Sequence, residues 1–291
     1  MKNKLLPYGA LILAIYLWGI SFILTRALLD RVSPALFIPL RFLIALLLFL
    51  PFQRKYPLPS KKELLLMLAI SLFQPGLYFI GETYAIENLG PSLTSLLIGT
   101  IPLFTAIGSW MLFKQKPKRN FWIGFVLSML GLWLLFFPLP IPREQAFIGF
   151  GAILLAIITA ACYMILTNKV SQNITAIQIS FWQFLFGFIF FLPWALVTRP
   201  ALPEDLGMTS LLLVIMAIGP TAGAFFTYNY ALSKMSANKA SLGLNLIPIV
   251  TVVTGMMIYK EVWTTRQLAV ALIVVLGLII GNLKFKKPLP E

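Results

Sequence analysis

Four polar residues recur at helical spacing inside one long apolar stretch, and they are Ser71, Gln74, Tyr78 and Glu82. Their separations of three, four and four positions place all four on one face of an α-helix. That face offers several hydrogen-bonding groups and one carboxylate. Two interpretations are open: the face lines a solute-binding cavity, or each group bonds to a neighbouring helix. Pro75, which would loosen the helix beside these groups, favours the cavity.

Arg41 is a second ionisable residue within an apolar stretch. At 1.5 Å per residue it lies about 10 Å from the nearer end of its helix, and Glu82 lies about 6 Å from an end of the next. The two side chains could form an ion pair. Alternatively, the planar guanidinium could hold the carboxylate of a bound solute. Glu82, as a buried carboxylate, is also our candidate for proton coupling.

Further polar and aromatic residues extend this candidate cavity into other apolar stretches. Thr221 and Asn229 share one helical face, with Phe225 between them. The remaining cavity candidates are Trp18, Tyr163, Gln183, Tyr228 and Asn245. Proline removes a backbone donor from a helix, and the candidates for helix breaks or gating hinges are Pro75, Pro102, Pro220 and Pro248.

The composition places these residues in a lipid bilayer. Of the 291 residues, 59% are hydrophobic and 11% are charged, against about 45–50% and about 25% in an average soluble domain. The net charge is +14, but the basic residues stand in short clusters between apolar runs. This pattern favours a membrane surface over nucleic acid as the partner. The N-terminal apolar run is too long for a signal peptide, and we interpret it as a retained first helix.

Apolar stretches of about 20 residues predict an all-α protein with ten transmembrane helices. The expected ranges are 8–28, 34–52, 64–86, 92–113, 121–137, 147–168, 176–197, 208–232, 237–259 and 266–283. With the N-terminus in the cytoplasm, sixteen of the 23 Lys and Arg residues fall inside and six outside. We therefore expect a multi-pass protein of the cell membrane with both termini in the cytoplasm.

The two halves of the sequence resemble each other. Residues 84–102 recur as residues 230–248, both opening on Tyr-Ala and closing on Ile-Pro, and residues 22–51 match residues 164–193 at eight of 30 positions. The offsets of 146 and 142 predict two repeats, 1–140 and 141–291, with five helices each. Because five is odd, the second repeat would lie inverted in the membrane, as in many secondary transporters. Arg41 then corresponds to Gln183.

A family resemblance rests on Trp18-Gly19 and on Tyr230, Ala231, Leu232, Ser236, Ala237, Ala240, Ser241, Leu242, Pro248 and Glu261. This pattern resembles the EamA type of the drug/metabolite transporter superfamily. The resemblance implies a ten-helix bundle around a central cavity that moves amino acids or other small metabolites, most often outward. The sequence departs from the pattern at Gln115, where the first repeat commonly carries a glutamate, and at Asn245, where the family is usually apolar.

We therefore expect a monomeric secondary transporter, not an enzyme, that exports amino acids or related amphipathic compounds by alternating access. The sequence has no histidine, one cysteine (Cys162) and no phosphate-binding P-loop, so we expect no metal, no cofactor and no ATP hydrolysis. One alternative is an exchanger of sugar phosphates or nucleotide-linked metabolites. Such an exchanger would require several cationic residues facing the cavity, in addition to Arg41. A second alternative is an integral membrane enzyme, and a third is a scaffold that transports nothing.

Overall fold

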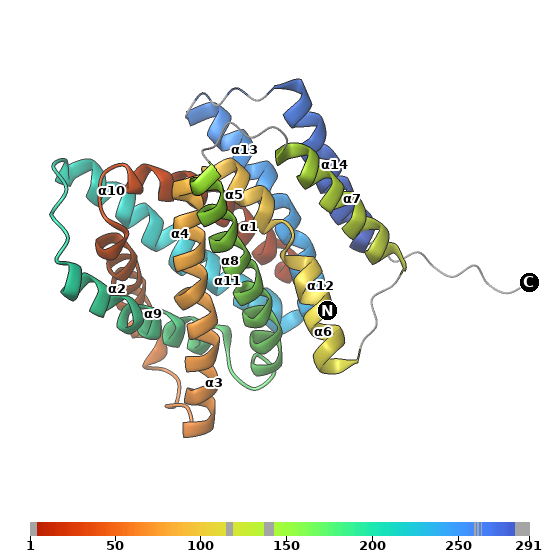
Figure 1. The fold of residues 1–291 in the computed structure, drawn as a ribbon. Helices are drawn as coiled ribbons and strands as arrows, with labels where there is room; N and C mark the ends of the chain where they lie inside the picture. The colour runs from red at the N-terminus through yellow and green to blue at the C-terminus, as the bar shows by residue number, and fades with distance from the viewer. Residues whose placement is uncertain are drawn as a thin grey trace, which may run out of the picture.

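The chain folds into a bundle of helices in the computed structural model (Figure 1). The structure describes residues 5–114, 119–136, 143–258, 260, 262 and 264–282. Gln115, Glu261 and the expected boundary between 140 and 141 lie outside these residues. No strand occurs in the described ranges, which agrees with the expected all-α class.

Seven described helical segments are long and apolar enough to cross a membrane, which makes the chain a multi-pass membrane protein. Two shorter apolar helices cover Leu244–Ile258 and Leu268–Gly277. The first part of the chain forms α1 (Leu6–Leu29), α2 (Pro34–Gln53), α3 (Lys61–Ser71), η1 (Leu72–Leu77), α4 (Tyr78–Leu89), α5 (Pro91–Ile98), α6 (Ile101–Phe113) and α7 (Arg119–Phe136). The second part forms α8 (Arg143–Val170), α9 (Ala176–Thr198), α10 (Leu206–Met216), η2 (Ala217–Gly223), α11 (Ala224–Lys234), α12 (Ala237–Gly243), η3 (Leu244–Leu246), α13 (Ile247–Ile258) and α14 (Thr265–Asn282).

Two long apolar segments are interrupted at Pro75 and Pro220, which are two of the candidate helix breaks in the sequence. The segment η2 is π-helical and the segment η1 is a kink between two helices, and each contains a proline, Pro220 or Pro75 respectively. Each lies inside an apolar segment of 29 residues, Lys61–Leu89 or Leu206–Lys234. Gln74, with φ −146° and ψ 115°, leaves the helical region altogether, so the backbone breaks there. The single helical face expected for residues 71–82 is therefore wrong at this point.

Pro102 and Pro248 each occupy the second position of a helix, α6 and α13 respectively. A proline fits there because the backbone N–H of a first-turn residue has no helical partner in any case. The expected breaks at these two prolines are found. They separate α5 from α6, and α12 from α13 with the 3₁₀ turn η3 between them.

The helices α2 and α9 pack together in opposite directions. The rings of Phe42 and Phe191 have centroids 6.1 Å apart, and those of Phe49 and Phe184 are 5.2 Å apart. Residue numbers therefore rise along α2 as they fall along the adjacent α9, which defines an antiparallel pair.

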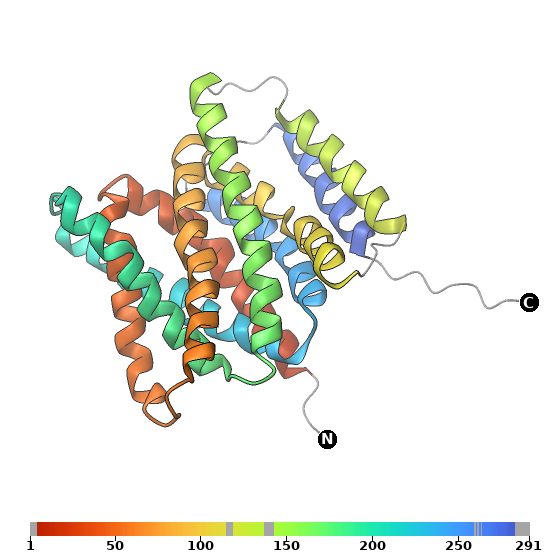
Figure 2. The same cartoon turned by 60° about the horizontal axis from the view of Figure 1, so that its bottom comes forward.

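The helices α7 and α14 form a second antiparallel pair, at one edge of the bundle in both views (Figures 1 and 2). A Cβ atom on Gly131 would lie 2.7 Å from Val274 Cγ2. Nearer the start of α14, Arg266 Nη2 donates to the Leu134 carbonyl at 3.4 Å. Later residues of α7 thus meet earlier residues of α14.

The helix α4 is held closely against α8 by small residues. A Cβ atom on Gly81 would lie only 2.4 Å from the Ala152 carbonyl oxygen, and one on Gly149 would lie 2.5 Å from Leu89 Cγ. Glycine lets two helices approach this closely in a membrane, where packing rather than water exclusion drives association. This contact fixes the position of α4, which carries Tyr78 and Glu82.

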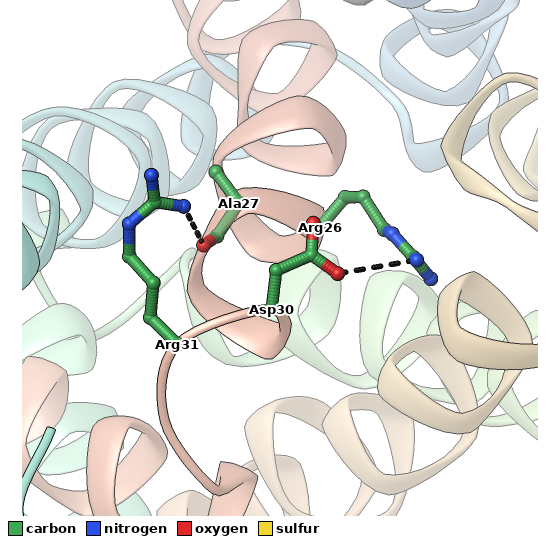
Figure 3. Close-up of polar contacts among 4 residues, drawn as sticks. All are labelled: Arg26, Ala27, Asp30 and Arg31. Carbon is green, nitrogen blue, oxygen red and sulfur yellow. Dashed lines mark hydrogen bonds and ion pairs between the residues drawn. The ribbon is translucent and has the colours of Figure 1, made fainter. Parts of the chain in front are cut away.

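The charged residues at the end of α1 make local polar contacts with one another and with the helix backbone (Figure 3). Arg26 Nη2 pairs with Asp30 Oδ1 at 3.1 Å, and both side chains are more than one-third exposed. Arg31 Nη1 donates to the Ala27 carbonyl at 2.9 Å, where a cation suits the negative end of the helix dipole. An exposed pair of this kind contributes at most about 1 kcal/mol, so it marks a helix end and not a binding site.

Candidate functional site

A small cavity lies near the centre of the bundle, among residues of α1, α2, η1, α4, α5, α6, α8, η3 and α13. Its volume is about 20 Å³, which leaves room for about one water molecule. Sites for small molecules are typically about 300 Å³ or larger. The conformation described is therefore closed, and any larger solute requires the surrounding helices to separate.

The polar side chains that line the cavity all come from the first half of the chain: Ser21, Arg41, Gln74, Tyr78 and Glu82. The lining residues of the second half are all apolar: Ala160, Met164, Leu244 and Ile247. The polar lining therefore belongs to the first half of the chain, whereas both halves contribute apolar lining.

Arg41 is the cationic residue among these polar lining side chains, and it is 1% exposed. Its Nε donates to Thr221 Oγ1 of η2 at 2.7 Å. Its Cζ lies 4.5 Å from the centroid of the Phe79 ring, close enough for a cation–π interaction. The ion pair considered between Arg41 and Glu82 is not formed in this conformation, because no nitrogen of Arg41 lies within 4.0 Å of a Glu82 carboxylate oxygen.

Glu82 lies one turn beyond Tyr78 on α4, and the Tyr78 hydroxyl donates to Glu82 Oε1 at 2.9 Å. Both residues line the cavity together with Gln74, whose side-chain oxygen has no hydrogen-bond partner in the described chain. Ser71 does not line it, and its hydroxyl donates instead to the Met67 carbonyl at 2.7 Å. Three of the four residues predicted on one face thus meet at the cavity.

Tyr163, Gln183 and Asn229 form a separate buried network and do not line the cavity. The Tyr163 hydroxyl donates to Asn229 Oδ1 at 2.7 Å, and Asn229 Nδ2 donates to Gln183 Oε1 at 2.7 Å and to Ser180 Oγ at 2.9 Å. Gln183 Nε2 extends this series of hydrogen bonds by donating to the backbone carbonyl of Gln74 at 2.9 Å. Their predicted place in the lining is wrong for this conformation, because these groups satisfy one another.

Thr221, Tyr228 and Asn245 are also absent from the lining, although Trp18 belongs to it. Thr221 accepts from Arg41, as described above. Tyr228 packs its ring against Trp18 with centroids 4.8 Å apart. Neither the Tyr228 hydroxyl nor the Asn245 amide has a hydrogen-bond partner among the described residues, so the geometry assigns these two buried groups no role.

The apolar lining residues could not be identified from the positions of polar residues in the sequence. Eight lining residues form four pairs at the offsets of 142 and 146 that relate the two halves of the sequence. The pairs are Trp18 with Ala160, Phe22 with Met164, Ile98 with Leu244, and Ile101 with Ile247. The internal repeat was the signal that could have found them, because these residues stand at equivalent positions of the two matching halves of the sequence.

A multi-pass helical bundle with buried ionisable side chains facing a central cavity is the architecture of a membrane transporter. The chain belongs to the EamA-like transporter family, whose sequence model matches residues 5–137 and again residues 147–283. The family resemblance predicted from the sequence is therefore confirmed.

The chain is similar along almost its whole length to other transporters. It is 25% identical over 299 residues to "Uncharacterized transporter YetK" of Bacillus subtilis (strain 168), covering 99% of this chain and 90% of that protein. It is 24% identical over 286 residues to "Probable amino-acid metabolite efflux pump" of Salmonella typhimurium, covering 94% of each. A solved crystal structure shares the fold with a TM-score of 0.75 and 16% identity, covering 95% of this chain and 98% of that one.

Proposed function

We propose that this protein is a secondary transporter that exports amino acids or related amphipathic metabolites from the cell by alternating access. The observation that carries the proposal is that Arg41 and Glu82 line the same small cavity with no nitrogen–oxygen contact within 4.0 Å, although their opposite charges attract each other there. An amino acid offers the complementary charges. Its carboxylate would take two hydrogen bonds from the guanidinium, and its ammonium group would bind the Glu82 carboxylate. The name of the Salmonella relative supports the same solute class and direction.

The apolar lining residues from the second half of the chain would then contact the side chain of the substrate. Ala160, Met164, Leu244 and Ile247 offer no hydrogen bonds there. A zwitterionic head and an apolar tail would bind in one orientation only, because a buried charge against these residues would lack a partner. This division supports amphipathic compounds over uniformly polar ones.

We further propose ten spans in two inverted repeats, 1–140 and 141–291. Helices at equivalent positions run antiparallel where they meet, namely α2 with α9 and α7 with α14. The four residue pairs around the cavity and the two separate matches of the family model support the same division. Inverted repeats suit alternating access, because exchanging the conformations of the two halves turns an outward-open state into an inward-open one.

Glu82 would couple export to protons. One carboxylate can bind a proton or the substrate ammonium group, but not both at once. A proton entering from outside would therefore displace the substrate, and the substrate leaving the cytoplasm would displace the proton. The chain would act as a monomer in this cycle, since both halves of the cavity come from one chain.

The alternatives fit the site less well. An exchanger of sugar phosphates or nucleotide-linked metabolites needs several cations, whereas Arg41 supplies the cation of this lining. A membrane enzyme would gather acid–base or metal-binding groups, and no cluster of three His, Cys, Asp or Glu residues occurs in the described part of the chain.

The substrate class is tested with the purified chain in proteoliposomes. We expect vesicles loaded with a mixed pool of amino acids and other metabolites to release one or more amino acids with an apolar side chain, measured by mass spectrometry. Vesicles without protein control for leakage. Release of other metabolites with no amino acid among them would contradict the substrate proposal and leave the family assignment intact.

The inverted arrangement is tested by cysteine labelling in a Cys162→Ser background. Lys61 and Glu204 are exposed: Lys61 begins α3, directly after the connection from α2, and Glu204 lies in the connection that follows α9. We expect a membrane-impermeant thiol reagent to label Lys61→Cys from the cytoplasmic side and Glu204→Cys from the outside. Labelling of both positions from the same side would contradict the inversion.

A further inference from the structure

Arg41 and Gln183 occupy equivalent positions of the two halves, and each bonds to the proline-containing segment of the other half, η2 or η1 respectively. Arg41 Nε on α2 donates to Thr221 Oγ1 in η2 at 2.7 Å. Gln183 Nε2 on α9 donates to the carbonyl of Gln74 in η1 at 2.9 Å. We call these contacts the Arg41 clasp and the Gln183 clasp. No amphipathic pattern or motif in the sequence predicts such reciprocal bonds.

The two clasps lie at different depths along the antiparallel pair of α2 and α9. Arg41 precedes Phe42, whose ring meets that of Phe191, whereas Gln183 precedes Phe184, whose ring meets that of Phe49. Phe49 lies seven residues beyond Phe42, which is about 10 Å along the helix axis. The Arg41 clasp is therefore nearer the end where α2 begins, and the Gln183 clasp is nearer the end where α9 begins.

Both clasps hold segments of the backbone that are irregular. The segments η1 and η2 each contain a proline, and Gln74 lies outside the helical region. The segment η2 is a short π-helical stretch, of a kind that is uncommon and frequently found at functional sites, whereas η1 is a kink between two helices. The Thr221 hydroxyl also donates to the Met216 carbonyl at 2.8 Å, and so links the Arg41 clasp to the start of η2.

The two clasps differ in what surrounds them. Arg41 lines the cavity, so a bound solute can compete for its guanidinium. Gln183 is fully buried behind the lining, where Asn229 donates to its side-chain oxygen. The Arg41 clasp is therefore open to the substrate, and the Gln183 clasp responds only to movement of the helices.

We propose that the two clasps are the closing bonds of two gates, with Thr221 and Gln183 as positioning residues. Under the inverted topology proposed above, on which this inference rests, the Arg41 clasp closes the outer side and the Gln183 clasp closes the cytoplasmic side. Both bonds are present in this closed conformation. A bond that is made in the closed state and lost on opening shifts the population toward the closed state. Removing either bond therefore favours opening on its own side.

The test measures the direction of opening with a reporter cysteine. Ser21 lines the cavity on α1, and Ser21→Cys in a Cys162→Ser background reports access from either side. We expect Thr221→Val to raise the labelling rate by an impermeant thiol reagent from outside, and Gln183→Met to raise it from the cytoplasm. The change should be about 3- to 10-fold for Gln183→Met, the effect of losing one neutral hydrogen bond, and about 10-fold or more for Thr221→Val, because that bond comes from a charged guanidinium.

Matched control variants distinguish the loss of a clasp from a general loosening of the helix packing. Thr221→Ser keeps the hydroxyl, and Ser180→Ala removes a neighbouring partner of Asn229 but leaves both clasps intact. Both should label at the parent rate. If Thr221→Val or Gln183→Met does not fold, Thr221→Ala or Gln183→Leu removes the same bond with less bulk or a different shape.

The outcomes for the clasps and for the transport proposal are distinguishable. Shifts in the same direction, or no shift in a folded variant, would overturn the clasps even if the chain transports amino acids. Opposite shifts would support them, and would still do so in a chain that releases no amino acid, where the substrate proposal alone would be overturned.

Discussion

Replacing Arg41 by Met should lower kcat/KM for amino-acid export by about 100-fold or more. Hydrogen bonds to a charged group are worth about 1.5–3 kcal/mol each, so losing a two-pronged contact to the substrate carboxylate accounts for this effect. Met has no donor and no charge, but it is unbranched and fills irregular space well. Initial rates in proteoliposomes, with the amount of folded protein measured for each variant, provide the test.

Two further variants make the Arg41 result specific. Arg41→Lys keeps the charge but lacks the planar fork, so it should recover only a small part of the activity. Arg26→Met removes a partly buried arginine at the end of α1, outside the cavity lining, and should leave transport within about twofold of the parent, since its ion pair contributes at most about 1 kcal/mol (Figure 3). Activity of Arg41→Met within about threefold of the parent would contradict the carboxylate-binding role.

The Arg41 side chain has two proposed roles, and Thr221→Val separates them. That variant removes the clasp at Nε but leaves the rest of the guanidinium available to the substrate. Loss of activity in Arg41→Met together with retained substrate affinity in Thr221→Val would place the binding role on the guanidinium itself. Equal losses in both variants would instead assign the whole effect of Arg41 to the clasp.

The features that depend on composition and periodicity were predictable from the sequence. A membrane imposes helical spans with internally satisfied backbones, so long apolar runs predict helices directly. The positions of Tyr78 and Glu82 at the cavity followed from their spacing of one turn within α4, whereas Gln74 lines the cavity from the non-helical break before α4. The placement of these three at the cavity agrees with the predicted lining, although their part in binding stays a prediction.

The partners of the buried polar residues were not predictable, because they depend on contacts between distant parts of the chain. Asn229 and Gln183 are 46 positions apart, and Arg41 and Thr221 are 180 apart. A polar side chain in a span faces either a cavity or another polar group, and its own sequence context does not distinguish the two. Tyr163, Gln183 and Asn229 bond to one another and do not face the cavity in this conformation, and for this reason the prediction that they line it was wrong.

Proton coupling is tested most directly by replacing Glu82 with Gln. Glutamine keeps the size of the side chain and an oxygen that can accept from the Tyr78 hydroxyl, but it does not take up a proton. We expect export driven by an imposed pH gradient to fall at least about tenfold. Exchange of labelled for unlabelled amino acid at equal pH should continue with a raised KM, because the substrate carboxylate still binds Arg41 while its ammonium group has lost an ionic partner.

Tyr78→Phe is the matched control for Glu82→Gln. It removes the hydrogen bond to Glu82 Oε1 but leaves a carboxyl group that can still bind and release a proton. We therefore expect Tyr78→Phe to keep the response to the pH gradient, even if its rate falls. Export by Glu82→Gln that still follows the pH gradient would show that the proton is carried elsewhere. Loss of exchange together with loss of pH-driven export would instead make Glu82 a substrate-binding residue whose protonation is not coupled to transport.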